Sequence, residues 1–225
     1  MPLEVALPAH VPAGMAVWRL ALNEGAAVER ADWLLLSADE RERAQGLRRH
    51  ADRLRLVAGR AALRRLLAER LGRPAQDLRF GYGSHGKPHL PDCAAVAFNV
   101  AHSASCVLIA LGADGAAIGV DVERHDVGCD VEGLAEHALT PAERADLAAA
   151  PDAVAGFFQL WSAKEAVLKA LGVGLGECLQ EFSVRRDADR RLFVAHQAAH
   201  WPTLQVCALD VPGGFSAALA WRARE

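Results

Sequence analysis

The sequence has no long hydrophobic run and no paired cysteine motif. None of its 225 residues lies in a stretch approaching about 18 uninterrupted apolar residues, so we expect no transmembrane helix. The amino-terminal residues Met-Pro-Leu-Glu-Val lack the basic start and apolar run of a signal peptide. The five cysteines are scattered and form no CxxC pair, which favours free thiols in a reducing cytoplasm and argues against a zinc site.

Several motifs that would define other functions are also missing. The sequence contains no GxSxG, no HExxH, no GxGxxG after a strand and no Walker A spacing. It shows no helix-turn-helix spacing, zinc finger or aromatic RNA-binding motif, so we do not expect nucleic acid as a partner. What is present, 52% hydrophobic and 24% charged residues, fits a globular protein with a substantial core.

Positive charge is concentrated in one stretch. Residues 41–73 contain eleven arginines and three acids, a balance of +8, whereas the remainder of the chain carries −11 within a net charge of −3. A pair of solvated, arginine-rich helices would explain this stretch. A site for phosphates or for an acidic protein would explain it equally well.

The order of predicted elements suggests two similar halves. A strand at 16–22 precedes helices at 37–50 and 52–71, and strands at 78–82, 95–100 and 106–111 follow. A short helix opening at Thr140 and a long helix at 153–171 then precede strands at 181–186, 192–196, 204–209 and 216–221. We therefore predict an α+β fold of two pseudo-symmetric subdomains, 1–114 and 115–225, with a ligand between them.

Two acidic side chains share a face of another predicted strand. In residues 118–123 (Ile-Gly-Val-Asp-Val-Glu), apolar positions alternate with Gly119, Asp121 and Glu123. Both carboxylates therefore point the same way, with a small residue beside them. Such acidic pairs often serve only solubility, and metal binding is the alternative.

The long helix carries a third acid and a lysine. Trp161, Glu165 and Lys169 are four residues apart and share one helix face. A surface Glu–Lys pair is the simple reading, but the many apolar neighbours indicate partial burial, where unpaired charge is costly. If strand and helix meet, three oxygen ligands lie beside one cation, as in a magnesium site that handles a phosphate.

Two further segments can serve either structure or ligand binding. Residues 82–88 (Tyr-Gly-Ser-His-Gly-Lys-Pro) form a predicted loop whose backbone N–H groups could hold phosphate, or an ordinary hairpin turn. Residues 97–103 form a predicted strand that runs into a polar turn at His102, which could be a structural histidine or a ligand contact.

Together these blocks resemble the 4′-phosphopantetheinyl transferases of the Sfp type. The resemblance covers roughly residues 37–221 and rests on Gly-Lys-Pro, Phe-Asn-x-x-His-Ser, Ile-Gly-Val-Asp-x-Glu and Trp-Ser-x-Lys-Glu-x-x-x-Lys-x-x-Gly-x-Gly-Leu, in that order. The last motif is the most specific and is complete from Trp161 to Leu175. The resemblance implies two fused α+β halves, a monomer, and transfer of 4′-phosphopantetheine from coenzyme A to a serine of an apo carrier protein, with release of adenosine 3′,5′-bisphosphate.

The resemblance also implies roles for individual residues. Mg²⁺ would be held by Asp121, Glu123 and Glu165, and Glu123 is the least essential because some relatives lack it. Glu165, Lys169 and Asp121 would be catalytic, Lys169 by neutralising phosphate charge and Glu165 by helping to deprotonate the serine. Coenzyme A would be bound by Arg43, Arg53, Gly86, Lys87, Asn99, His102 and Lys169.

Two other functions remain open from the sequence. Another Mg²⁺-dependent phosphate enzyme, a phosphohydrolase or a nuclease, could use the same acids with water as the acceptor. A non-catalytic coenzyme A-binding module would have no need for Asp121, Glu165 and Lys169 together. The sequence does not distinguish fatty-acid, polyketide and nonribosomal-peptide carriers.

Overall fold

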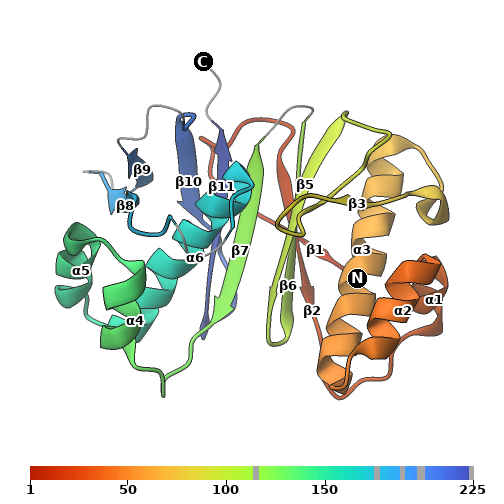
Figure 1. Cartoon of the computed structure of the whole chain (residues 1–225), viewed down its shortest axis with the longest axis horizontal. Helices are drawn as coiled ribbons and strands as arrows, with labels where there is room; N and C mark the ends of the chain where they lie inside the picture. Colours follow the sequence, from red (N-terminus) through yellow and green to blue (C-terminus); the bar gives the residue numbers. More distant parts are fainter. Residues whose placement is uncertain (114–116, 175–177, 188–190, 197–200, 223–225) are drawn as a thin grey trace.

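Two antiparallel sheets stand side by side, and helices cover the outer face of each (Figure 1). The structure is a computed structural model, and it describes residues 1–113, 117–174, 178–187, 191–196 and 201–222. The α+β class predicted from the sequence is confirmed. Among the described residues, no helix is long and apolar enough to cross a membrane.

The first half combines a four-stranded sheet, in the order β1-β2-β6-β5, with three helices and a small hairpin. Its elements are β1 (Leu3–Val5), β2 (Ala16–Ala21), α1 (Arg30–Leu35), α2 (Ala38–Gly46), α3 (His50–Leu71), the 3₁₀ turn η1 (Ala75–Asp77), β3 (Gly81–Tyr82), β4 (Pro88–His89), β5 (Val96–Ser103) and β6 (Cys106–Ala113).

The second half combines a five-stranded sheet, in the order β7-β11-β10-β9-β8, with three helices. Its elements are β7 (Ile118–Arg124), α4 (Val131–Ala138), α5 (Pro141–Ala148), α6 (Ala153–Leu171), β8 (Phe182–Arg186), β9 (Leu192–His196), β10 (Leu204–Ala208) and β11 (Phe215–Arg222).

Helix ends lie where the capping residues predicted them. Ser37 and Glu40 form a capping box at the start of α2, and Thr140 and Glu143 form one at the start of α5. Helix α6 spans the predicted residues and ends at Gly172, which adopts the left-handed conformation at a φ of +76°. Because α6 spans the predicted residues, Glu165 and Lys169 share a helix face as expected.

Other predicted elements differ in extent. The helix expected at 37–50 ends at Gly46, and of the strand expected at 78–82 only Gly81 and Tyr82 pair, after a 3₁₀ turn. Helices α1 and α4 were not predicted, and both are short, at six and eight residues. The boundary expected at residue 114 and the motif residue Leu175 lie outside the described residues.

One hydrophobic core is shared by both sheets. It contains Leu108 and Ala110 from β6 together with Val120, Leu219 and Trp221 from β7 and β11, and all five are at most 1% exposed. Residues 7–15 lie across this core before β2 begins. Packing of this kind fixes the position of one sheet against the other.

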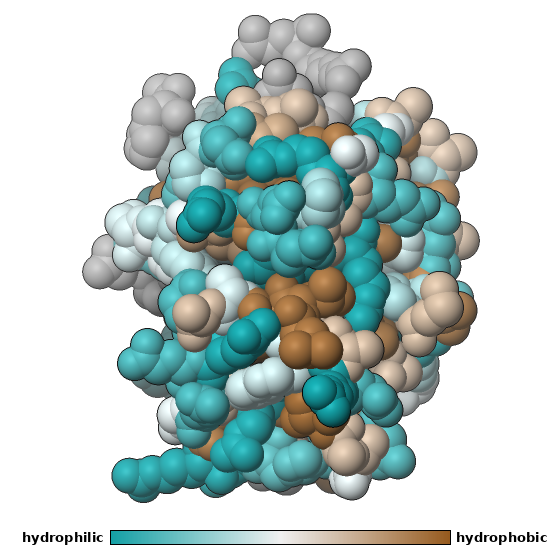
Figure 2. Space-filling model, turned by 90° about the vertical axis from the view of Figure 1, so that its right-hand side faces the viewer, coloured by the Kyte–Doolittle hydropathy of each residue, from teal (hydrophilic) through white to brown (hydrophobic). Residues whose placement is uncertain are grey.

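The arginine-rich stretch lies on α2 and α3, on the face shown in Figure 2, where hydrophilic residues surround a hydrophobic patch. Several of these arginines are used inside the protein. Buried Glu40 accepts from Arg64 at 2.8 Å and lies 3.3 Å from Arg60. Arg55 pairs with Asp52, and Arg65, Arg73 and Arg41 also have internal partners. A large part of the local positive charge is therefore structural.

Candidate active site

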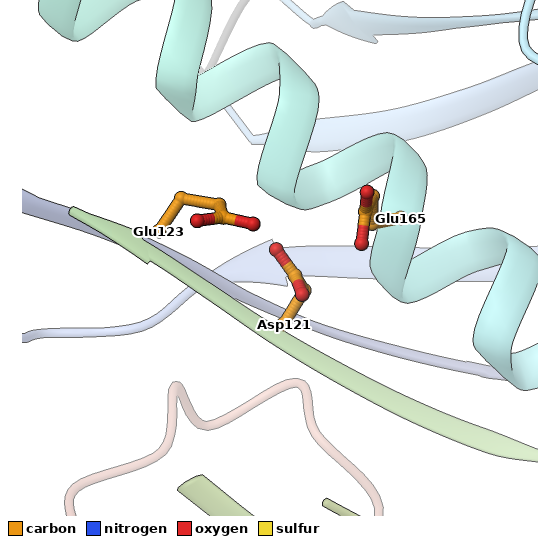
Figure 3. Close-up of side chains that lie close together, drawn as sticks. All are labelled: Asp121, Glu123 and Glu165. Carbon is orange, nitrogen blue, oxygen red and sulfur yellow. The ribbon is translucent and has the colours of Figure 1, made fainter. Parts of the chain in front are cut away.

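Three carboxylates meet where β7 crosses α6 (Figure 3). Asp121 and Glu123 come from the same face of β7, and Glu165 comes from α6. One oxygen from each lies within 4.8 Å of the others. Asp121 is 2% exposed and Glu165 is 7% exposed, whereas Glu123 is only half-buried. The predicted strand and helix therefore do meet, which was the condition for a metal site at these three acids.

Gly119 allows the strand and the helix to approach this closely. A Cβ atom at this position would collide with the backbone oxygen of Ala166 and the backbone nitrogen of Ala170, both on α6. No side chain can stand between the two elements here. The glycine that the alternation placed beside the acids is thus the point of closest contact between β7 and α6.

Lys169 completes the cluster as its cation. Its Nζ lies 2.5 Å from Asp121 Oδ1 and 3.5 Å from Glu165 Oε2. Although burial opposes it, the carboxylates of Asp121 and Glu165 raise the pKa of Lys169, so its ammonium group stays charged. The lysine therefore balances part of the negative charge of the three acids.

Burial makes ionisation of the acids unfavourable. Burial raises the pKa of Asp121, although the positive charge of Lys169 opposes this rise. Burial also raises the pKa of Glu123, and the negative charge of Asp121 raises it further. Burial and the charge of Asp121 raise the pKa of Glu165 to about 7. Asp121 Oδ2 is buried and has no hydrogen-bond partner among the described residues. An additional cation at this point would stabilise the ionised acids and give Asp121 Oδ2 a partner.

Sequence reasoning did not identify Ser103 as part of the site. Its hydroxyl donates to Glu123 Oε2 at 2.9 Å and accepts from the backbone N–H of Arg124 at 3.1 Å. The position of Ser103 directly after His102, at the end of a strand, was the available signal. Its contact with β7 depends on how the two sheets are placed, which no local pattern reveals.

The loop between β3 and β4 lies against the end of α6. Lys87 Nζ donates to the backbone oxygens of Ile118, at 2.9 Å, and Lys169, at 2.6 Å, and burial lowers the pKa of Lys87 to about 8. Gly86 has a φ of +75° in the same loop. A Cβ on Gly174 would meet His85 Nδ1 at 2.9 Å. The loop is thus fixed to the start of β7 and the end of α6 through Lys87.

A pocket of about 370 Å³ opens beside this loop. Its wall is formed by the loop, by β5 and by the ends of β7 and α6, through residues that include His85, Lys87, Phe98, Ile118 and Gly172. The pocket therefore joins parts of both halves of the chain.

The remaining predicted ligand residues lie in the first half. Asn99 is buried on β5, and its Oδ1 accepts from the backbone N–H of Val120 on β7. His102 is exposed at the end of β5, and partial desolvation, with the positive charge of Arg55 adding to it, lowers its pKa. Arg53 donates to Leu47 O at 3.0 Å and leaves its buried Nε without a partner among the described residues.

Arg43 differs from most arginines of the stretch. It is exposed on α2, and no hydrogen bond or ion pair joins its side chain to any residue that the structure describes. The structure thus brings Asp121, Glu123, Glu165 and Lys169 together and places Lys87 against the backbone of Lys169. Arg43 is left with its charge free for another group.

The arrangement suits chemistry on a phosphate, because three hard oxygen donors meet beside a fixed ammonium group. Two family models match the chain. One, described as the 4′-phosphopantetheinyl transferase superfamily, matches residues 117–220, and one for the amino-terminal part of such transferases matches residues 29–113. This chain belongs to the 4′-phosphopantetheinyl transferase superfamily, and it is an enzyme of that class.

Two relatives agree with this assignment by sequence. The chain is 31% identical over 192 residues to the 4′-phosphopantetheinyl transferase ffp of Bacillus subtilis, covering 84% of each protein. It is 35% identical over 173 residues to the transferase HetI of a Nostoc species, covering 75% of this chain and 72% of HetI. A holo-(acyl-carrier-protein) synthase structure from Bacillus anthracis, in complex with CoA (3′,5′-ADP), aligns at a TM-score of 0.42 and 20% identity, over 48% of this chain and 96% of that one.

Proposed function

We propose that this enzyme transfers the 4′-phosphopantetheine group of coenzyme A to a serine hydroxyl of an apo carrier protein and releases adenosine 3′,5′-bisphosphate. One observation supports this most directly: Asp121, Glu123 and Glu165 meet within 4.8 Å beside Lys169, in a member of the transferase superfamily. A binding protein for coenzyme A would gain nothing from confining three acids in this way, because each buried carboxylate costs free energy.

The donor set fits a magnesium ion. Asp121, Glu123 and Glu165 supply carboxylate oxygens, which Mg²⁺ prefers, and Asp121 Oδ2 has no other partner among the described residues. These three residues would hold the ion, which when bound would draw negative charge from the pyrophosphate of coenzyme A.

The protein's own groups would carry out the proton and charge transfers. Glu165, which lies beside Lys169 in the cluster, would accept the proton of the attacking serine. The serine oxygen would form a bond to the phosphorus that bears the pantetheine arm, and the bond from that phosphorus to the bridging oxygen would break. The Lys169 ammonium would neutralise charge on the departing adenosine bisphosphate.

The nucleotide end of coenzyme A would bind on the first half. The pocket beside Lys87 offers space between the β3–β4 loop and β5. His102, Arg53 and Arg43 would bind phosphate, chiefly the 3′-phosphate, because each presents a ring nitrogen or a positive charge on that side of the chain. Asn99 contributes by holding β5 against β7. We further propose a division of labour between residues 1–114, for coenzyme A, and 115–225, for metal and catalysis, in a cytoplasmic monomer.

Intact-mass measurement of a carrier protein tests the proposed function. Incubation with this enzyme, coenzyme A and Mg²⁺ should increase the mass of an apo carrier protein by one phosphopantetheine group. A carrier whose acceptor serine is replaced by alanine is the matched control and should stay unmodified. Unchanged masses of acyl, peptidyl and aryl carriers, with the enzyme folded and Mg²⁺ present, would contradict the proposal.

The same reaction without a carrier distinguishes transfer from hydrolysis. A transferase should leave coenzyme A intact when no acceptor serine is present, because water does not replace the carrier. A phosphohydrolase should release adenosine 3′,5′-bisphosphate at the same rate with or without the carrier.

A further inference from the structure

Strands β5 and β7 lie side by side at the junction of the two halves (Figure 1), yet they belong to different sheets. Strand β5 pairs through its backbone with β6, and β7 pairs with β11. In the described part of the chain no backbone ladder joins β5 to β7. Polar groups along this junction therefore need side-chain partners.

Two side chains of β5 supply those partners. Asn99 Oδ1 accepts from the backbone N–H of Val120 at 2.9 Å, and Ser103 Oγ accepts from that of Arg124 at 3.1 Å. The acceptors are four residues apart on β5, and the donors are four residues apart on β7. The two strands therefore run in the same direction, and the side-chain bonds set the register between them.

Ser103 makes a second hydrogen bond, to Glu123. A hydroxyl has one proton and two acceptor lone pairs. Because the N–H of Arg124 occupies an acceptor position of Ser103, the single proton is free to point to Glu123 Oε2, 2.9 Å away. The Ser103 hydroxyl is thus oriented by the backbone of β7 toward a carboxylate on the same strand.

Glu123 is the carboxylate of the cluster that most needs such support. Lys169 pairs with Asp121 and Glu165, and among the described residues it makes no ion pair with Glu123. Glu123 is also the most exposed of the three acids. Besides the bond from Ser103 it has a hydrogen bond with the Trp161 side chain of α6, and without these partners its side chain would sample several rotamers.

We infer that Ser103 is a positioning residue that holds Glu123 in its metal-binding orientation, so that a side chain of the first half sets the metal affinity of the second. The inference rests on the proposed function, in which Glu123 is a metal ligand. Residues that orient a ligand from behind typically change metal affinity by 10–100-fold when removed. The hydroxyl of Ser103 acts through Glu123 and touches no reacting atom.

A matched set of variants measures this effect. Titration calorimetry with Mg²⁺, and with Mn²⁺ as a second probe, gives the metal affinity without any turnover. We expect Ser103→Val and Ser103→Ala to weaken metal binding about 10-fold, and Ser103→Thr, which keeps the hydroxyl on a side chain shaped like valine, to stay within about 2-fold of the original protein. Ser105→Ala, in the turn of the same hairpin, should change nothing.

A double-mutant cycle tests whether Ser103 acts through Glu123. If it does, Ser103→Ala should cost no further metal affinity in a Glu123→Gln background. In transfer assays the Mg²⁺ concentration for half-maximal rate should rise in the Val and Ala variants, while the KM for coenzyme A stays unchanged.

The outcomes separate this inference from the proposed function. If the original protein binds neither Mg²⁺ nor Mn²⁺, the proposed metal centre is wrong and the inference fails with it. If it binds metal and transfers phosphopantetheine, but Ser103→Val binds metal equally well, the function stands and the inference is overturned. Unfolding of both hydroxyl-free variants, with Ser103→Thr folded, would also overturn it, because the hydroxyl would then serve the junction alone.

Discussion

At the scale of single residues, the site gathers ionisable side chains in a buried environment that disfavours their charged forms. Asp121 and Glu165 are almost fully buried, and their carboxylates lie close to each other and to Lys169. The ion pairs hold the side chains in place, but one lysine cannot balance three acids. The unbalanced negative charge of the metal-free cluster therefore destabilises the folded protein, and a bound divalent cation would remove this cost.

Removal of either buried acid should stop the reaction without unfolding the protein. We expect Asp121→Ala and Glu165→Ala to lower kcat at least about 100-fold, since each removes a metal ligand and a charge next to the reacting phosphate. Carrier mass and circular dichroism measure activity and fold in the same samples. Glu69→Gln, at an exposed position on α3, is the control. Near-normal turnover in either alanine variant would contradict the ligand assignment.

The metal-free protein should lose stability as the pH rises from about 5 to 7. Glu165 has an ordinary pKa of 4.5 and a pKa of about 7 in the folded protein. Between these values the folded state keeps a proton that the unfolded state has lost, so the free energy of unfolding falls with rising pH, by on the order of 3 kcal/mol.

Chemical denaturation at several pH values measures this slope. Glu165→Gln should flatten it, because the amide does not titrate, and Mg²⁺ should stabilise the original protein more at pH 8 than at pH 5, because metal and proton compete for the same oxygens. A slope that is identical in the original protein and in Glu165→Gln would assign the effect to other groups.

At the scale of elements, the site is the contact of one strand with one helix. Strand β7 is buried along its first five residues, and α6 crosses it at Gly119. The strand brings Asp121 and Glu123, and the helix brings Glu165 and Lys169. Their separation is therefore set by how closely two backbones approach.

Gly119→Ala should push these elements apart. Its Cβ would meet backbone atoms of Ala166 and Ala170, which cannot rotate away, so we expect a loss of about 3 kcal/mol or more in the free energy of unfolding. Thermal and chemical denaturation measure this change. Gly213→Ala, where a Cβ meets nothing within 4 Å, is the control. A folded Gly119→Ala protein of unchanged stability would show that the contact can relax.

Much of this strand–helix contact was predictable from sequence. The caps of α5 and α6 and the alternation around Asp121 are local signals, and they placed the helix ends and the carboxylates correctly. The roles of Ser103 and Asn99 were not predictable, because they depend on β5 lying against β7. The arginine-rich stretch also gave an incomplete picture, because Arg64 pairs with Glu40 and Arg55 with Glu24, and both acids lie outside residues 41–73.

At the scale of the whole molecule, the two halves of the sequence are not separate bodies. Leu108 and Ala110 of the first sheet pack in one core with Leu219 and Trp221 of the second. Side-chain hydrogen bonds between β5 and β7, and the contacts of Lys87 with Ile118 and Lys169, add polar links across the same junction. The halves should therefore unfold together.

A core substitution in one half should destabilise both. Leu108 is fully buried on β6, and we expect Leu108→Ala to lower the free energy of unfolding by about 2–5 kcal/mol. Hydrogen exchange followed by mass spectrometry should then accelerate in β11 as well as in β6. Val127→Ala, at a position that is 87% exposed, should have no effect on either strand. Acceleration confined to the first sheet would mean that the halves open independently.

The shared core also determines how this chain can be recombined. A chimera that joined residues 1–113 to the second half of a homologue would bring two unmatched sets of side chains into one buried interface around Trp221. Each half would be correct by itself, and the junction would be overpacked or hollow. A single crossover at α1 or α4 would divide the same core, because Val17 precedes α1 and Leu219 and Trp221 follow α4. Exchange of only the segment from α4 to α5, which contributes no residue to this core, leaves the interface intact and is the better route to hybrid enzymes.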